Sequence, residues 1–142
     1  MAKHLFFASF LLSCISGPAM AECLDVTVAA QGREGTVLVG VYGTKHPFPK
    51  PGKHLVASKA VLANGGATMR FDDVPAGRYA LAAGIDENKN GKVDVNFLGI
   101  PSEPVAFSTG AEASMFGPPA FDDAALEVPA GKACATAEIR FK

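Results

Sequence analysis

Apolar and polar residues alternate with a period of two along most of this sequence, and no other feature constrains the fold as strongly. The alternation is clearest in residues 24–28 and 37–41, and it returns in residues 69–72, 78–83 and 135–141. Successive side chains of a strand point to opposite faces of a sheet, so this pattern predicts strands with one buried face. No window repeats apolar residues at helical spacing over the length of a helix.

Turn-forming residues separate these segments and keep them short. The chain contains 15 Gly and 10 Pro, and two further strand patterns lie in residues 55–62 and 124–128. Short strands separated by regular turn signals are typical of all-β sandwiches. The sequence therefore predicts a single all-β sandwich of about seven strands.

One corner of the predicted sandwich has a specific sequence, FDDVPAGRY in residues 71–79. Pro75 presets φ for the start of the turn, and Gly77 can take a left-handed conformation. Phe71 and Tyr79 then face the core from consecutive strands, and the Tyr79 hydroxyl can return to the turn backbone. The corner is similar to those of transthyretin-like and bacterial adhesin repeat sandwiches. The expected fold class is thus an immunoglobulin-like or transthyretin-like β-sandwich.

The first 21 residues have the form of a secretory signal peptide. A basic lead that contains Lys3 precedes an apolar run in residues 5–15, and residues 19–21, Ala-Met-Ala, supply a small-residue cleavage signal. We therefore expect export of residues 22–142, as one domain, to the periplasm or the medium. Residues 11–14, Leu-Leu-Ser-Cys, offer the alternative of a lipoprotein signal that would lipidate its cysteine.

Charge and hydropathy argue against two classes of partner. The formal net charge is −1 at pH 7, and loss of Lys3 with the leader would make it −2. No electrostatic attraction to nucleic acid or to an anionic membrane surface is therefore expected. No segment after the leader is apolar over the length of a transmembrane helix, so we expect no membrane insertion of the mature domain. The expected partner is an unknown protein or small ligand.

Two cysteines, Cys23 and Cys134, remain after the loss of Cys14 with the leader, and they lie at opposite ends of the domain. An even pair in an oxidising compartment predicts a disulfide. Cys23 shares its parity with Asp25, and Cys134 with Thr136, so both sulfurs should lie on the polar faces of their strands. Because each cysteine is near the start of its strand, the first and last strands are predicted to be parallel neighbours.

The segment DENKNGKVD, residues 86–94, has an oxygen-bearing side chain at every second position through its first half and then a glycine. An EF-hand calcium loop takes ligands from positions 1, 3, 5, 7 and 9, with glycine at 6 and a bidentate glutamate at 12. Positions 1 to 9 are matched by Asp86, Asn88, Asn90, the Lys92 carbonyl and Asp94. Gly91 matches position 6, but position 12 is Phe97.

The strongest ligand of such a loop is missing, and a strand pattern precedes the loop where a helix would be. The sequence therefore predicts a weak Ca²⁺ site of the kind found in extracellular modules, with Glu103, Asp122 or Asp123 as a further ligand. The alternative is a metal-free turn in which the Asp and Asn side chains accept hydrogen bonds from their own backbone. Both interpretations stay open at this point.

Around this loop the sequence resembles a known family. The segments that carry the resemblance are DENKNGKVDVNFLGIPSE in residues 86–103, AFS in residues 106–108 and FGPPAF in residues 116–121. They resemble the bacterial family of small exported proteins known as domain of unknown function 2141. The sequence Glu103-Pro104-Val105 departs from the glycine and aromatic residues expected after the glutamate. The resemblance implies export and a β-sandwich, and it implies no established activity.

The connection over residues 96–120 is unusually long and contains six large apolar residues, Phe97, Leu98, Ile100, Phe107, Met115 and Phe116. Connections of this length are often functional when they are ordered. Their apolar side chains could cap an open end of the sandwich or form a contact surface for a partner. We expect that they cap the sandwich.

No arrangement of residues in the sequence specifies a reaction. His46 and His54 lie in a loop rich in Lys and Pro, where histidines are usually solvated, although they could bind a metal. The pairs Asp72-Asp73 and Asp122-Asp123 would serve catalysis only if their carboxylates converged on one point. The predicted function is an exported module that binds or scaffolds an unknown ligand. The alternative is a carboxylate-dependent, hydrolase-like enzyme of the cell envelope.

Overall fold

The computed structural model describes residues 22–131 and 134–142, so the predicted signal peptide lies outside the described residues. Strands dominate the described part, and the only helix in it is the short α1 (Phe121–Ala124). The strands are β1 (Leu24–Ala29), β2 (Thr36–Gly43), β3 (Val56–Val61), β4 (Gly66–Phe71), β5 (Gly77–Asp86), β6 (Val105–Phe107), β7 (Ala125–Val128) and β8 (Ala135–Arg140). The all-β prediction is confirmed, and no helix among these residues is long and apolar enough to cross a bilayer.

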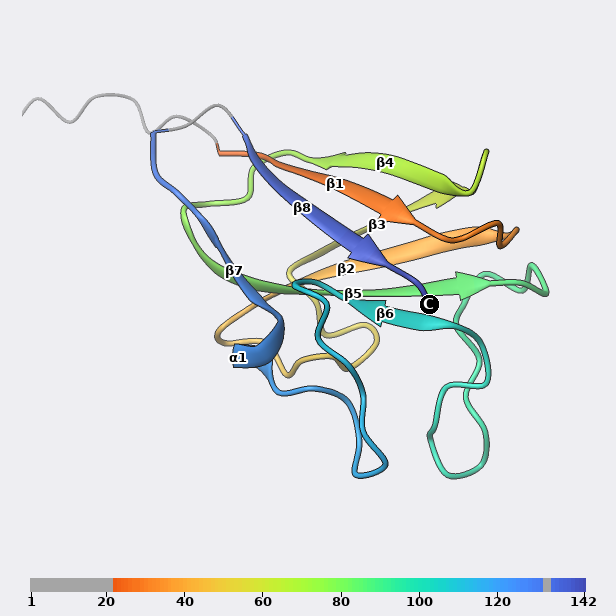
Figure 1. Cartoon of the computed structure of the whole chain (residues 1–142). Coiled ribbons are helices and arrows are strands. Elements are labelled where there is room, and N and C mark those ends of the chain that lie inside the picture. The colour runs from red at the N-terminus through yellow and green to blue at the C-terminus, as the bar shows by residue number, and fades with distance from the viewer. Residues whose placement is uncertain (1–21, 132–133) are drawn as a thin grey trace, which may run out of the picture.

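The strands form two sheets that stack as a sandwich (Figure 1). One sheet has the order β4-β1-β8, and the other has the order β3-β2-β5-β6, with β7 also paired to β5. β1 pairs antiparallel with β4 on one side and parallel with β8 on the other, where Leu24 lies opposite Ala135. The prediction that the first and last strands are parallel neighbours is therefore confirmed.

A disulfide between Cys23 and Cys134 joins the starts of β1 and β8. The two Cα atoms lie 4.5 Å apart although 111 positions separate them in the sequence. The Ala135 N–H donates to the Cys23 carbonyl at 2.8 Å, so the parallel ladder begins beside the crosslink. The predicted pairing of the two cysteines is confirmed.

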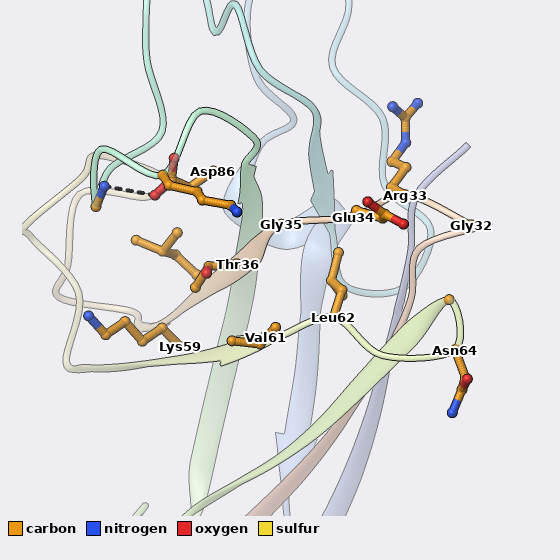
Figure 2. A pocket seen from close by; sticks show the side chains of 14 residues that line it. Gly32, Arg33, Glu34, Gly35, Thr36, Lys59, Val61, Leu62, Asn64 and Asp86 are labelled. Atoms are coloured by element: carbon orange, nitrogen blue, oxygen red, sulfur yellow. Dashed lines mark hydrogen bonds between the residues drawn. The ribbon is translucent and has the colours of Figure 1, made fainter.

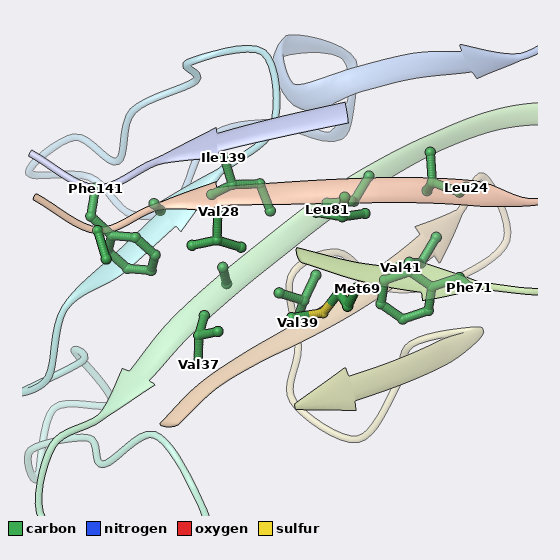
Figure 3. Close-up of a cluster of buried hydrophobic side chains, with 14 of the residues drawn as sticks. Leu24, Val28, Val37, Val39, Val41, Met69, Phe71, Leu81, Ile139 and Phe141 are labelled. Atoms are coloured by element: carbon green, nitrogen blue, oxygen red, sulfur yellow. The ribbon is translucent and has the colours of Figure 1, made fainter. Parts of the chain in front are cut away.

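The two sheets enclose one apolar core (Figure 3). Alternate residues of the central strands are buried, as the period of two requires. The inner faces contribute Leu24, Val26, Val28, Val37, Val39, Val41, Met69, Phe71, Tyr79, Leu81, Ile85, Ile139 and Phe141. At the predicted corner, the Tyr79 hydroxyl donates to the Pro75 carbonyl at 2.7 Å. The corner thus has the predicted arrangement of its core tyrosine.

A second, smaller apolar cluster lies on the outer face of the five-stranded sheet. Ala80 and Phe107 are buried there, and Phe48 packs between the rings of Phe107 and Phe121 at centroid distances of 5.9 and 6.1 Å. Beside it the buried Ser108 hydroxyl donates to the Ala124 carbonyl at 2.5 Å and accepts the Leu81 N–H at 2.9 Å. β6 and α1 are therefore fixed to β5, and they anchor the long connection of residues 96–120.

Truncation of Phe71 tests the core and its register. Phe71→Ala should lower the free energy of unfolding by ~3–5 kcal/mol, because it removes a buried aromatic side chain and leaves a cavity. Phe97→Ala is the matched control, since the same truncation at an exposed side chain should change stability by less than about 0.5 kcal/mol. Urea unfolding of both variants measures the difference, and equal effects would contradict the strand register described here.

Removal of the crosslink tests its contribution. On the chain-entropy model, closure of so long a loop contributes up to ~4–5 kcal/mol, so Cys23→Ser/Cys134→Ser should unfold at markedly lower urea concentration. A reducing agent should destabilise the natural protein and leave the double variant unchanged. Two thiols that react with an alkylating agent in the purified natural protein, without reductant, would contradict the disulfide.

Candidate functional site

The predicted calcium segment forms a loop, here called the 86–94 loop, that begins at the last residue of β5. Asp86 is 2% exposed although it is charged, and its position is fixed by pairing with Thr36 of β2. A side chain at Gly35 would come within 2.6 Å of the Asp86 carbonyl oxygen, so glycine permits the close approach of the two strands. The start of the loop is therefore part of the rigid sheet.

The Asp86 carboxylate caps the turn that follows it. Its Oδ1 accepts the Asn90 N–H at 3.1 Å, and its Oδ2 accepts the Gly91 N–H at 2.7 Å. Gly91 has a φ of +88°, which a residue with a side chain rarely adopts. These bonds give the buried carboxylate two backbone partners and close the turn.

The Asp94 carboxylate closes the other side of the loop. Its Oδ2 accepts the amide N–H groups of Asn88 at 2.6 Å and of Asn90 at 2.7 Å, and Lys92 Nζ lies 3.6 Å from Oδ1. The hydrogen bond from Asn88, with those from Asn90 and Lys92, lowers the pKa of Asp94 below its usual value, although burial acts in the opposite direction. Asp94 therefore loses its proton at a lower pH than an ordinary aspartate does.

Glu103 ties the loop to the chain that follows it. Its Oε1 accepts the N–H groups of Glu87 at 2.9 Å and Asn88 at 3.3 Å, and its Oε2 accepts the Asp94 N–H at 2.9 Å. The sequence analysis named Glu103 only as a metal ligand and missed this role. No local pattern could indicate it, because the three donors lie 9 to 16 positions away in the sequence.

The structure brings the five predicted ligand residues into one loop, but their side-chain oxygens already accept hydrogen bonds. Besides the two carboxylates, Asn88 Oδ1 accepts the Asn90 N–H and Asn90 Oδ1 accepts the Lys92 N–H, both at 3.1 Å. The side-chain amide groups of Asn88 and Asn90 also donate hydrogen bonds to Asp94. A cation that bound to Asp94 together with the oxygens of these amides would require both amides to rotate. Among the described residues, no group of three or more His, Cys, Asp or Glu side chains could hold a metal.

The other two predicted ligands lie elsewhere. Asp122 and Asp123 belong to α1, where Asp122 pairs with Arg78 and the Asp123 carbonyl accepts the Thr109 hydroxyl. The metal-free turn accounts for every contact observed in the loop, and Ca²⁺ binding stays a prediction.

The 86–94 loop folds back against the outer face of β5. Val93 packs on Gly84 so closely that a Cβ at Gly84 would overlap with the Val93 side chain. Glycine at this position therefore allows the loop to lie on the strand rather than to extend into solvent. The chain after Val93 consequently leaves the sandwich from a fixed point.

A groove of about 700 Å³ lies beside the 86–94 loop, at the end of the sandwich (Figure 2). It is lined by the β1–β2 and β3–β4 turns and by the edge strand β3. Lys59, Arg33 and Lys89 bring positive charge to it, and Glu34 and Asp86 bring negative charge. Arg33 is engaged with Glu87 at 3.7 Å and with the Lys142 carbonyl at 2.9 Å. The mixed charges do not converge on one point, so the groove does not define a ligand.

Two turns of the long connection expose large apolar side chains, and we call them the 96–100 turn and the 114–117 turn. Phe97 is 95% exposed, Met115 91% and Phe116 93%, and Leu98 and Ile100 are also exposed. The expectation that these side chains cap the sandwich is therefore wrong for all of them. Only Phe107, in β6, is buried as that expectation required.

Both turns project away from the sandwich. Figure 1 shows them extending beyond the five-stranded sheet, on the side away from the three-stranded sheet. The 96–100 turn emerges next to the 86–94 loop, and the 114–117 turn emerges between β6 and α1. Two segments of the long connection that carry exposed apolar side chains thus project on the same side of the molecule.

The residues considered for catalysis do not form a common site. His46 Nδ1 accepts the Gly43 N–H at 3.2 Å, and His54 packs edge-on against Tyr42 at a centroid distance of 6.1 Å. Asp72 and Asp73 follow β4 at the corner, whereas Asp122 and Asp123 lie in α1. These acids do not line the groove beside the 86–94 loop.

Thermal unfolding in excess EDTA and in ~10 mM Ca²⁺ tests the calcium prediction. If the 86–94 loop binds Ca²⁺ with a dissociation constant of about 10⁻⁴ M, the ion at 100 times that concentration adds about 2.7 kcal/mol to the free energy of unfolding. Asp94→Asn should lose this gain, because it removes a charge and keeps an oxygen that accepts hydrogen bonds. Identical melting curves of the natural protein in both solutions would identify the loop as a metal-free turn.

The comparisons with known proteins agree with the resemblance noted in the sequence. No curated protein and no solved structure matches the chain. One family model matches residues 26–136, which include strands β2 to β7, the 86–94 loop and both apolar turns. The chain therefore belongs to the bacterial family described as "Uncharacterized protein conserved in bacteria (DUF2141)".

Proposed function

We propose that the protein is an exported binding module, periplasmic or secreted, that contacts its partner through the 96–100 and 114–117 turns. The observation that carries this proposal is the exposure of five large apolar side chains on these two turns. Exposed apolar surface is costly in water, and its concentration on projecting loops is typical of interaction sites.

The sequence of the two turns supports contact with an apolar partner. Residues 95–102 and 113–121 contain no charged residue, whereas charged residues make up 19% of the whole chain. Depletion of charge and enrichment in Phe, Met and other apolar residues are characteristic of the buried centre of an interface. The turns thus have the composition of a surface that is covered during function.

The sandwich gives both turns a rigid base. The 96–100 turn begins after the 86–94 loop, which is fixed by Asp86, Asp94 and Glu103. The 114–117 turn lies between the buried Phe107 and α1, which both pack on β5. A binding loop on a rigid scaffold loses less conformational entropy on contact than a flexible loop.

Two features support export. Residues 1–21 have the sequence of a secretory signal peptide, and the Cys23–Cys134 disulfide is typical of proteins in an oxidising compartment. In this proposal the 86–94 loop has a structural role, because it fixes the position of the 96–100 turn. Ca²⁺ binding would make the loop more rigid. Nothing in residues 22–131 and 134–142 favours a hydrolase-like activity.

Photo-crosslinking from the turns tests this function in the producing cell. A photoreactive amino acid in place of Phe97 or Phe116 should give adducts with a cell-envelope component, because both positions would lie in the contact. The matched control is the same replacement of Val61, which is 74% exposed on β3 and lies outside both turns. Adducts from Val61 as abundant as those from the turns would contradict the proposal.

A further inference from the structure

We infer that the partner of the two apolar turns is a lipid surface with neutral headgroups, into which Phe97, Met115 and Phe116 insert. This inference rests on the proposed function and names its partner class. It concerns shallow insertion of side chains at the ends of two turns and not a membrane-spanning segment. Three independent features of the turns favour a lipid surface over a protein partner.

The first feature is the hydrogen bonding of the 96–100 turn. The Asn96 N–H donates to the Ile100 carbonyl at 2.8 Å, and the Gly99 N–H donates to the Asn96 carbonyl at 2.9 Å. The Asn96 side-chain Oδ1 accepts the N–H groups of Leu98 at 2.9 Å and Ile100 at 3.1 Å. Four of the five backbone N–H groups in the turn are therefore satisfied within it.

The 114–117 turn is closed in the same way. Ser114 and Gly117 exchange both backbone hydrogen bonds, at 2.8 and 3.1 Å, and the Ser114 hydroxyl accepts the Phe116 N–H at 3.2 Å. Three of its four backbone N–H groups are thus satisfied within the turn. Lipid offers few hydrogen-bond partners to a backbone that enters it, so internally bonded turns can insert at low cost. A protein partner would not require this closure.

The second feature is the state of the charges that flank the turns. Asp94 and Glu103, on either side of the first segment, accept hydrogen bonds from amide and backbone N–H groups. Glu112 and Asp122, on either side of the second, pair with Lys142 and Arg78. Three of these four acids have a basic partner, since Lys92 Nζ also lies 3.6 Å from Asp94, whereas Glu103 accepts backbone N–H groups. These flanking residues therefore carry no excess of positive charge, so they offer no electrostatic attraction to anionic headgroups and favour a neutral lipid surface.

The third feature is shape. The turns are two separate projections that extend beyond the same side of the five-stranded sheet (Figure 1). Phe97, Met115 and Phe116 are more than nine-tenths exposed, so each side chain stands clear of its own turn. A fluid lipid interface accommodates separate projections without matched pockets, whereas a protein partner would need a pocket for each.

The chain contains no Trp, so a single introduced Trp reports on its own position without background. We would prepare Phe97→Trp, Phe116→Trp and the control Val61→Trp, and add vesicles of phosphatidylcholine. Emission of both turn variants should shift to the blue and should be quenched by lipids that carry a quencher in the acyl chain. Emission of Val61→Trp should not change, and the shifts should persist at high salt because no charge attraction is involved.

Vesicle flotation of unlabelled variants gives an independent readout. Phe97→Ser/Phe116→Ser should lower the partition coefficient on phosphatidylcholine by at least roughly a hundredfold, about tenfold for each aromatic side chain that no longer inserts. Val61→Ser is the control and should partition like the natural protein. All substitutions are at exposed positions, and thermal unfolding confirms that each variant is folded.

Three results would overturn the lipid assignment. The first is an absence of shift and flotation with phosphatidylcholine, and the second is binding to anionic vesicles only, in a manner that salt abolishes. The third is a blue shift that depends on protein concentration without vesicles, which would indicate self-association. If crosslinks from Phe97 and Phe116 in cells joined only protein, the lipid assignment would fail while the proposed binding function would stand.

Discussion

The position of β1 between β4 and β8 is the constraint on which the rest of the fold depends. β1 contributes Leu24, Val26 and Val28 to the core, and its two neighbours come from the middle and the end of the described chain. Because β8 pairs with β1, the chain must return to the three-stranded sheet after it has formed the five-stranded sheet. Because the pairing is parallel, β8 must also start at the same end as β1. The Cys23–Cys134 disulfide holds the starts of β1 and β8 together. It removes conformational freedom from the unfolded chain and thereby favours the pairing of these two strands.

The five-stranded sheet fixes the positions from which the two apolar turns leave the sandwich. Its outer face is partly covered by a small cluster around Ala80 and Phe107, and this cluster fixes the path of the chain between β6 and α1. At the other end of β5, Gly84 accommodates Val93, so the 86–94 loop lies on the sheet. The two apolar turns therefore leave the sandwich from positions that the core determines, and their side chains project because nothing in the described structure packs over them.

The sequence predicted those features that depend on local patterns. Alternation in residues 24–28 and 37–41 identified buried strands, and the corner around Tyr79 behaved as its proline and glycine required. β6 was missed, because three residues are too few to produce an alternation. For Phe97 and Phe116 the expectation was burial, and exposure on a contact surface was the alternative. Composition favours burial of such residues, and no local pattern shows that the two turns close on their own hydrogen bonds and leave these side chains exposed.

The candidate site also shows what residue spacing alone cannot predict. The spacing of Asp86, Asn88 and Asn90 indicated a loop with converging oxygens, and the structure does gather these residues. Spacing alone could not show that their oxygens accept backbone N–H groups, because a calcium loop and an Asx turn use the same residue types. Glu103 also holds together the two ends of the segment that carries the 96–100 turn. With the Ser102 N–H bonded to the Asp94 carbonyl at 2.9 Å, it closes the base of residues 95–102. We therefore expect that the length and composition of this segment can change while the sandwich keeps its fold.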